Sequence, residues 1–247
     1  MRAARLVQAL VAGTLLVVAT SPLAEAQRGL GKGRGRQPAT APTEQPTPKD
    51  QPAGKDQAQP KEELGAELAL PWSEGEARVI GQREKDATVL VRADATESQV
   101  KKLLPTAGVV HLATHGELSE DDPLSSAMLL VPGGGEDGRL EVREVFGLDM
   151  QARLVVLSAC ETGLGKLSRG DELVGLQRAF LYAGTPAVVT TLWKVDDKAT
   201  FELVRSFYTR LEGTGPVEAL RQAQVETMRA FPHPDAWAAF GLSGLPR

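Results

Sequence analysis

The sequence predicts an α/β fold in which a mainly parallel sheet carries helices on both faces. Three continuous aliphatic runs, Val109–Ala113, Leu154–Ser158 and Ala187–Thr191, are typical of strands that are buried on both sides. Segments with a helical spacing of apolar residues alternate with these runs, as they do in βαβ units. Residues 63–247 have a length that suits one domain of this class.

The remaining elements follow from local signals. Thr88–Val91 is a short run rich in β-branched residues, which favours a strand. Thr96 can cap a helix over residues 97–104, and Pro105 ends it. The other expected elements, in chain order, are an apolar run and four helices, over residues 127–131, 142–146, 172–183, 199–211 and 216–229.

The N-terminal residues 1–26 have the pattern of a secretory signal peptide. Arg2 and Arg5 form the charged start, residues 6–19 are apolar, and a small–x–small pattern precedes Gln27. The sequence therefore predicts cleavage before Gln27, export to the periplasm or the exterior, and no role for this segment in the fold. The alternatives are a buried amphipathic helix, or a start codon placed too early, in which case the protein is cytoplasmic. No apolar run reaches the roughly 18–20 residues of a membrane-spanning helix.

Residues 27–62 are expected to be a disordered linker, because they are rich in Gly and Pro and have almost no apolar side chains to bury. This segment has seven Lys or Arg and four Asp or Glu, a net charge of +3, whereas residues 63–247 have 19 and 27, a net charge of −8. The whole chain has a net charge of −4, which gives no electrostatic footprint for nucleic acid.

The cysteine and histidine content limits the possible metal chemistry. Cys160 is the single cysteine, so an intramolecular disulfide and a multi-cysteine zinc site are excluded. His111 and His115 are four residues apart, but they lie on a run with strand character and lack an evident third ligand, so His111 is interpreted as a partly buried structural side chain. Residues 164–172 do not have the spacing of a phosphate-binding loop. No metal or cofactor is expected.

Candidate catalytic residues follow two of the buried strands. Ligands bind beyond the carboxyl ends of strands in parallel sheets, and His115 and Cys160 come directly after such strands. If those strands are neighbours, the two side chains can meet, since adjacent strands are about 4.8 Å apart. An imidazole beside a thiol can remove its proton and later protonate a leaving amine. The backbone amides of Gly116 and Cys160 could bind the oxyanion of an acyl-transfer intermediate.

A plainer interpretation of the same residues remains open. A cysteine after an apolar strand is often a small buried hydrophobic residue, and a histidine in that position often caps a turn.

Several motifs carry a resemblance to a known family. In order and spacing, these motifs resemble the CHAT domain, a caspase-like module related to separases within the caspase–hemoglobinase group of cysteine peptidases. The resemblance extends from about residue 70 to residue 245. The matching segments are HLATHG (111–116), VVLSACETG (155–163), GDELVGLQRAFLYAG (170–184), TTLWKVDD (190–197) and HPDAWAAFGLSG (233–244).

The resemblance implies a three-layer α/β/α sandwich and a His–Cys dyad. His115 matches the family's catalytic histidine, Cys160 its nucleophile, and Gly116 the oxyanion-hole glycine. In the related peptidases an acidic residue near the matching loop reads the P1 side chain, and Asp196 and Asp197 occupy that region here. A helix N-cap is the alternative role for these two carboxylates.

Two functions are therefore compatible with the sequence. The first is a caspase-like cysteine endopeptidase that acts on a polypeptide substrate. The second is a catalytically silent CHAT-fold module that binds or regulates a protein partner. Family members commonly carry helical repeats upstream and more domain sequence before residue 70, whereas this chain has the linker there, so we expect the domain to lack part of the usual sheet.

Overall fold

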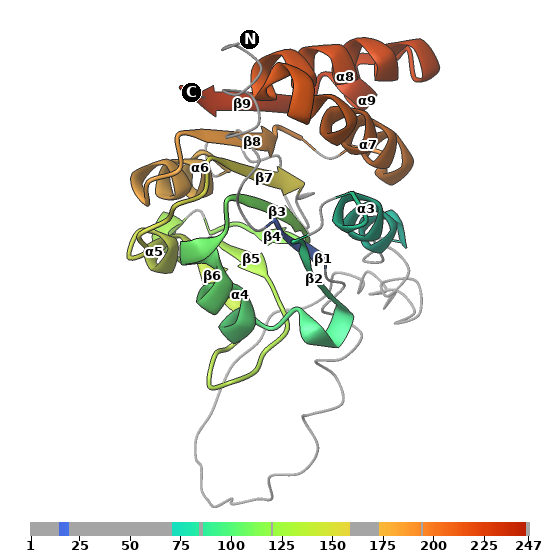
Figure 1. The fold of residues 1–247 in the computed structure, drawn as a ribbon. Coiled ribbons are helices and arrows are strands. Elements are labelled where there is room, and N and C mark those ends of the chain that lie inside the picture. Colours follow the sequence, from blue (N-terminus) through green and yellow to red (C-terminus); the bar gives the residue numbers. More distant parts are fainter. Residues whose placement is uncertain are drawn as a thin grey trace, which may run out of the picture. The chain divides into compact units, whose positions relative to one another are not determined.

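The computed structural model describes residues 15–19 and 71–245, except residues 84–85, 120, 159–172 and 194. A six-stranded sheet in the order β2-β1-β3-β7-β8-β9 forms the centre, and a separate three-stranded sheet has the order β4-β5-β6 (Figure 1). The strands of the large sheet are β1 (Leu15–Ala19), β2 (Thr88–Val91), β3 (Val109–Ala113), β7 (Leu154–Ser158), β8 (Ala187–Thr191) and β9 (Phe240–Gly244).

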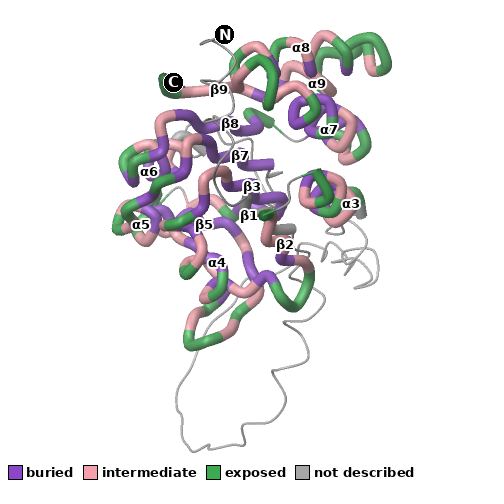
Figure 2. The backbone as a smooth tube through the Cα atoms, viewed as in Figure 1, coloured by how far each residue is buried: buried purple, intermediate pink, exposed green. Residues whose placement is uncertain are grey.

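The predicted parallel sheet is confirmed. Strands β3, β7 and β8 have the predicted bounds and pair in parallel, while β9 closes the edge antiparallel to β8. Every residue of β7 and β8 is buried, as expected for strands covered on both faces (Figure 2). The core therefore forms around the same strands whose carboxyl ends carry the candidate catalytic residues.

Strand β1 differs from the sequence expectation. Leu15–Ala19 pairs in parallel with β2 on one side and with β3 on the other, so a segment expected to lie outside the fold occupies an inner position of the sheet. The sheet therefore includes a strand from the segment before residue 70, which the sequence analysis leaves out of the fold. The predicted cleavage point before Gln27 and the linker 27–62 lie outside the described residues.

Cleavage before Gln27 would remove β1, so its effect on folding can be measured. We expect a chain that starts at Gln27 to be less stable than the full chain by at least about 3 kcal/mol, because β2 and β3 would both lose ladder hydrogen bonds in the middle of the sheet. Urea unfolding followed by circular dichroism tests this expectation. Equal unfolding midpoints would show that β1 contributes nothing to stability, and N-terminal sequencing of the protein isolated from its host would show which form is present.

Helices cover both faces of the large sheet (Figure 1). On one face α3 (Pro71–Gly81), α7 (Asp197–Thr214) and α8 (Pro216–Ala230) bury Ile80, Leu203 and Phe207 against Val156 and Val189. On the other face α4 (Glu97–Leu103), α5 (Val142–Val145) and α6 (Leu173–Tyr182) pack with Leu112, Leu157 and Phe180 in a second core. The short elements are η3 (Arg92–Asp94), η4 (Leu104–Thr106), η5 (Pro123–Ser125) and α9 (Pro234–Trp237).

Local signals explain where these helices begin and end. The Thr96 side chain accepts the Gln99 N–H and caps α4, as predicted, and the chain then tightens into η4 at Pro105. Helix α7 begins at Asp197, two residues before the predicted start, and extends to Thr214, where Gly215 adopts a positive φ of 78°. None of the helices in the described part of the chain is long and apolar enough to cross a membrane.

The small sheet was not predicted, because its strands have only two or three residues. It consists of β4 (Gly116–Glu117), β5 (Ala127–Leu129) and β6 (Arg139–Glu141), all antiparallel. The buried carboxylate of Glu97 binds the segment between β5 and β6. Its Oε2 accepts the N–H groups of Gly138 at 2.7 Å and Arg139 at 3.0 Å. The sheet is therefore attached to α4 and presents Gly116 directly after β3.

Candidate active site

The carboxyl ends of β3, β7 and β8 meet at one rim of the sheet. Ala113 pairs with Ser158, and Leu157 pairs with Thr190. The segments that follow these strands carry His115 after β3, Cys160 after β7 and Asp197 after β8. Sequence reasoning therefore placed the candidate residues on neighbouring strand exits, as the topology requires.

His115 is fixed by its backbone as well as by its burial. Its side chain is buried, with 1% of the residue exposed. The Leu129 N–H of β5 donates to the His115 carbonyl at 2.8 Å, and Gly116 stands opposite Met128 in the adjoining rung. The candidate base and the candidate oxyanion-hole residue therefore belong to one rigid segment between the two sheets.

Cys160 lies outside the described residues, as do residues 159–172 around it. The described strand that leads to it ends at Ser158, the register partner of Ala113. Cys160 follows Ser158 by two positions and His115 follows Ala113 by two positions. The relation between His115 and Cys160 therefore rests on the pairing of β3 with β7 and not on an interatomic distance.

The two candidate P1 carboxylates have different environments. Asp196 is the N-cap of α7, since its Oδ1 accepts the Ala199 N–H at 2.9 Å, and the alternative role considered for it is confirmed. Asp197 is half-buried and accepts the Trp72 N–H of α3 at 3.0 Å on Oδ2. This contact joins residues 125 positions apart, which no local sequence signal reveals.

The pKa of the Asp197 carboxyl depends on its burial and on the groups around it, including His115. Burial raises the pKa of this carboxyl above its ordinary value, and the charges of Glu76 and Asp196 act in the same direction. The Trp72 N–H and the charge of His115 lower it. Asp197 therefore lies within electrostatic range of His115.

A buried polar contact beneath the rim was also missed by the sequence analysis. His111, expected to be partly buried, is fully buried in β3. Its Nε2 lies 2.7 Å from Oε1 of Glu76 on α3, and its Nδ1 lies 3.1 Å from the hydroxyl of Tyr208 on α7. The carboxylate is close to the ring nitrogen but is not in line for a hydrogen bond with it. His111 thus connects both helices to the strand that leads to His115.

A cluster of three glutamates lies apart from the candidate catalytic residues, and a lysine contacts all three. Glu97, Glu136 and Glu144 lie close enough to share an ion, but the Lys101 ammonium contacts all three, at 3.4, 2.9 and 2.9 Å. Burial opposes the lysine charge, yet Glu144 and Glu136 outweigh it and raise the pKa of Lys101. Burial also raises the pKa of Glu97. The Lys101 ammonium therefore offsets part of the negative charge of this cluster.

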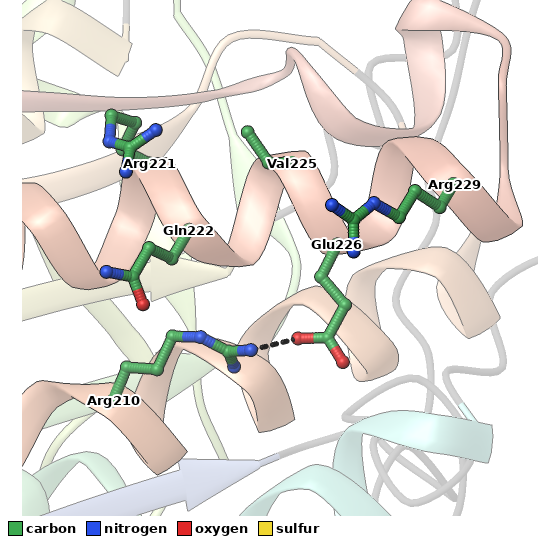
Figure 3. Close-up of a pocket in the computed structure, with 6 residues that line it drawn as sticks. All are labelled: Arg210, Arg221, Gln222, Val225, Glu226 and Arg229. Carbon is green, nitrogen blue, oxygen red and sulfur yellow. Dashed lines mark ion pairs between the residues drawn. The ribbon is translucent and has the colours of Figure 1, made fainter.

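A hollow of about 260 Å³ lies between α7 and α8 (Figure 3). Arg210 in this hollow pairs with Glu226 at 2.6 Å. The lining residues are Arg210, Arg221, Gln222, Val225, Glu226 and Arg229, and they include none of the candidate catalytic residues. The hollow is therefore separate from the candidate active site.

Comparison with known proteins agrees with this geometry. The CHAT domain family model matches residues 8–245. The chain belongs to the CHAT domain family. Tetratricopeptide repeat protein 28 of Homo sapiens is 30% identical over 211 residues, covering 71% of this chain and 8% of that protein. The protein of the same name in Mus musculus is 37% identical over 108 residues, covering 42% and 4%. This CHAT chain spans less than a tenth of either curated relative.

Solved structures confirm the predicted fold of this CHAT domain. Separase in the Saccharomyces cerevisiae separase–securin complex has a TM-score of 0.53 and 13% identity, covering 96% of this chain and 12% of that chain. The Arg-specific cysteine proteinase gingipain R (RgpB), from Porphyromonas gingivalis, has a TM-score of 0.53 and 12% identity, covering 95% and 46%. The chain therefore has the α/β fold of these caspase-like peptidases.

Proposed function

We propose that this CHAT domain is a cysteine endopeptidase in which Cys160 is the nucleophile and His115 is the general acid and base. The observation that carries this proposal is the parallel pairing of β3 with β7, with Ala113 opposite Ser158. Residues that follow two paired strands by the same number of positions leave the sheet at the same rim. The motifs around both residues also match those of the family.

The chemistry of the proposed dyad is acyl transfer to sulfur. The His115 imidazole takes the thiol proton as the Cys160 sulfur bonds to the scissile carbonyl carbon, and the carbonyl oxygen becomes an oxyanion. Collapse of this intermediate breaks the C–N bond, and the imidazolium gives its proton to the leaving amine. Water, deprotonated by the same imidazole, then hydrolyses the thioester and restores the thiol.

The backbone of Gly116 supports the proposed oxyanion hole. Because Leu129 N–H donates to the carbonyl of His115, the following pair, Gly116 and Met128, is a non-hydrogen-bonded pair of the antiparallel ladder. The Gly116 N–H is therefore directed away from β5. A preorganised donor of this kind typically contributes about 100- to 1,000-fold in rate.

We further propose that Asp197 binds a basic P1 side chain. Asp196 is engaged in capping α7, whereas Asp197 lies within the field of His115 and has a second carboxylate oxygen beyond the one that accepts the Trp72 N–H. The likeness in fold to an Arg-specific proteinase supports a basic residue at P1. Trp72, whose N–H donates to this carboxylate, and Trp193, four residues before it in the chain, have exposed rings that can pack on an extended peptide.

Peptides that differ only at P1 test the proposal with the wild-type protein and the Cys160→Ala variant. We expect cleavage after Arg or Lys in the wild type and none in the variant. Cleavage that continues unchanged in Cys160→Ala would exclude the mechanism.

Two asparagine variants distinguish the role of Asp197 in binding the P1 side chain from the capping role of Asp196. We expect Asp197→Asn to raise KM for a P1-Arg peptide by about 10- to 100-fold, the value of a lost hydrogen-bonded charge. Asp196→Asn is the matched control, because asparagine caps a helix as well as aspartate does. Equal KM values in Asp197→Asn and the wild type would remove Asp197 from the P1 site.

The pH dependence of KM provides a second test of Asp197. Its pKa is raised above the ordinary 3.8, so the carboxylate that binds Arg forms only as the pH rises through that higher value. We therefore expect KM for a P1-Arg peptide to fall as the pH rises from acid toward neutral, and we expect this fall to be absent in Asp197→Asn.

A catalytically silent regulatory module is the second candidate function. The observation in its favour is that the curated relatives are tetratricopeptide repeat proteins, of which this chain matches a small part. A partner protein is then the ligand, as securin is for separase. An electrophilic probe distinguishes the two functions, since a native protein that never labels at Cys160 would favour the silent module.

A further inference from the structure

Thr114 connects the catalytic segment to the small sheet. It lies between the end of β3 and His115, and it is fully buried. Its hydroxyl donates to the Leu129 carbonyl of β5. Leu129 in turn donates its N–H to the His115 carbonyl at 2.8 Å. One residue of β5 therefore contacts both the residue before the candidate base and the base itself.

The position of the Leu129 carbonyl is itself well defined. Leu130, the next residue, donates its N–H to the Gly138 carbonyl at 2.7 Å, and Glu97 accepts the Gly138 N–H at 2.7 Å. The Glu97 N–H donates to the Val131 carbonyl at 3.1 Å. These bonds attach β5 to the start of α4, so the acceptor of the Thr114 hydroxyl belongs to a rigid platform.

The ladder geometry gives the Thr114 hydroxyl a specific role. The Leu129 N–H bonds to the His115 carbonyl, next to the register pair Gly116 and Met128, and the hydroxyl of Thr114 reaches the carbonyl of the same leucine. This bond defines the rotation of the chain where β3 ends and β4 begins. A small rotation there would swing both the His115 imidazole and the Gly116 N–H away from a bound carbonyl group.

We propose that Thr114 is a positioning residue for the reaction, which acts by fixing the orientation of His115 and Gly116 together. The inference rests on the proposed peptidase function. Thr114 is buried and bonded to the main chain of β5, so it acts through its neighbours and does not touch the substrate. A displacement of catalytic groups by about 1 Å can lower a rate by roughly 100-fold.

Two variants of Thr114 isolate the hydroxyl. Thr114→Val keeps the β-branched shape and removes the donor, whereas Thr114→Ser keeps the donor and removes a methyl group. We expect Thr114→Val to lower kcat by about 10- to 100-fold with little change in KM, and Thr114→Ser to stay within about threefold of the wild type. If Thr114→Val does not fold, Thr114→Ala serves in its place. A wild-type kcat in the folded Val or Ala variant would overturn the proposal.

Imidazole NMR keeps this test separate from the test of the proposed function. The chain has three histidines, so each ring can be assigned by substitution. We expect the His115 ring signals to shift in Thr114→Val and to stay close to wild type in Thr114→Ser, while those of the exposed His233 stay unchanged in both. Unchanged His115 signals in the Val variant would overturn the positioning role. If the His115 signals shift in Thr114→Val but the wild-type protein cleaves no peptide, the positioning of His115 is retained and the peptidase function is rejected.

Discussion

Replacing His115 with asparagine is expected to lower kcat/KM for peptide cleavage by at least about 1,000-fold. Without the imidazole, nothing at the end of β3 takes the thiol proton or returns it to the leaving amine. Cleavage of a P1-Arg peptide by equal amounts of folded protein measures the effect. The double variant with Cys160→Ala should be no slower than the slower single variant, because the two residues act as one unit.

The matched control for this loss is His233→Asn. His233 is exposed and caps the short helix α9, a role that asparagine can take over. We expect wild-type cleavage in this variant. A His115→Asn protein that retains more than about a tenth of the wild-type rate would contradict the assigned role of His115.

The second large effect concerns stability. We expect Glu76→Ala to lower the free energy of unfolding by about 3–5 kcal/mol, because it removes the carboxylate beside a fully buried histidine and leaves Nε2 of that ring without its neighbour. This loss is a large fraction of the 5–15 kcal/mol that stabilises a typical domain. Urea unfolding of the variant and the wild type at one pH measures it.

Two further variants give this experiment its controls. Glu76→Gln keeps the shape and one oxygen near His111, so a smaller loss of about 1–2 kcal/mol is expected. Glu74→Ala removes a carboxylate two residues earlier on α3, whose partners Arg78 and Arg92 are exposed, and should cost about 1 kcal/mol or less. Equal losses in Glu74→Ala and Glu76→Ala would contradict a special role for the buried contact.

The parts of the fold that depend on continuous burial were predictable from sequence. The mainly aliphatic runs of β3, β7 and β8 match the structure residue for residue, because strands buried on both faces need mostly apolar side chains. The two- and three-residue strands β4 and β6 have no such pattern. The residues of β1 are compatible with a signal peptide as well as with a buried strand, because both contain a short apolar run, here after two arginines.

The sequence predicted only those candidate site residues that belong to a short, recognisable motif. His115 and Gly116 stand beside each other in such a motif. The contact of Asp197 with the Trp72 N–H, the contact of His111 with Glu76 and the bond from Thr114 to Leu129 each join distant segments. A sequence pattern does not specify such tertiary contacts, because each partner taken alone is a common polar residue.

The rate at which iodoacetamide alkylates Cys160 tests the central claim most directly, because the chain has a single cysteine and mass spectrometry of the intact protein reports on it alone. If His115 stands beside the sulfur and favours the thiolate, the folded wild type should react at pH 6 at least about tenfold faster than His115→Asn, while the two proteins react alike once unfolded in urea. Equal rates for the two folded proteins, or no labelling of the folded wild type, would contradict the proposed dyad.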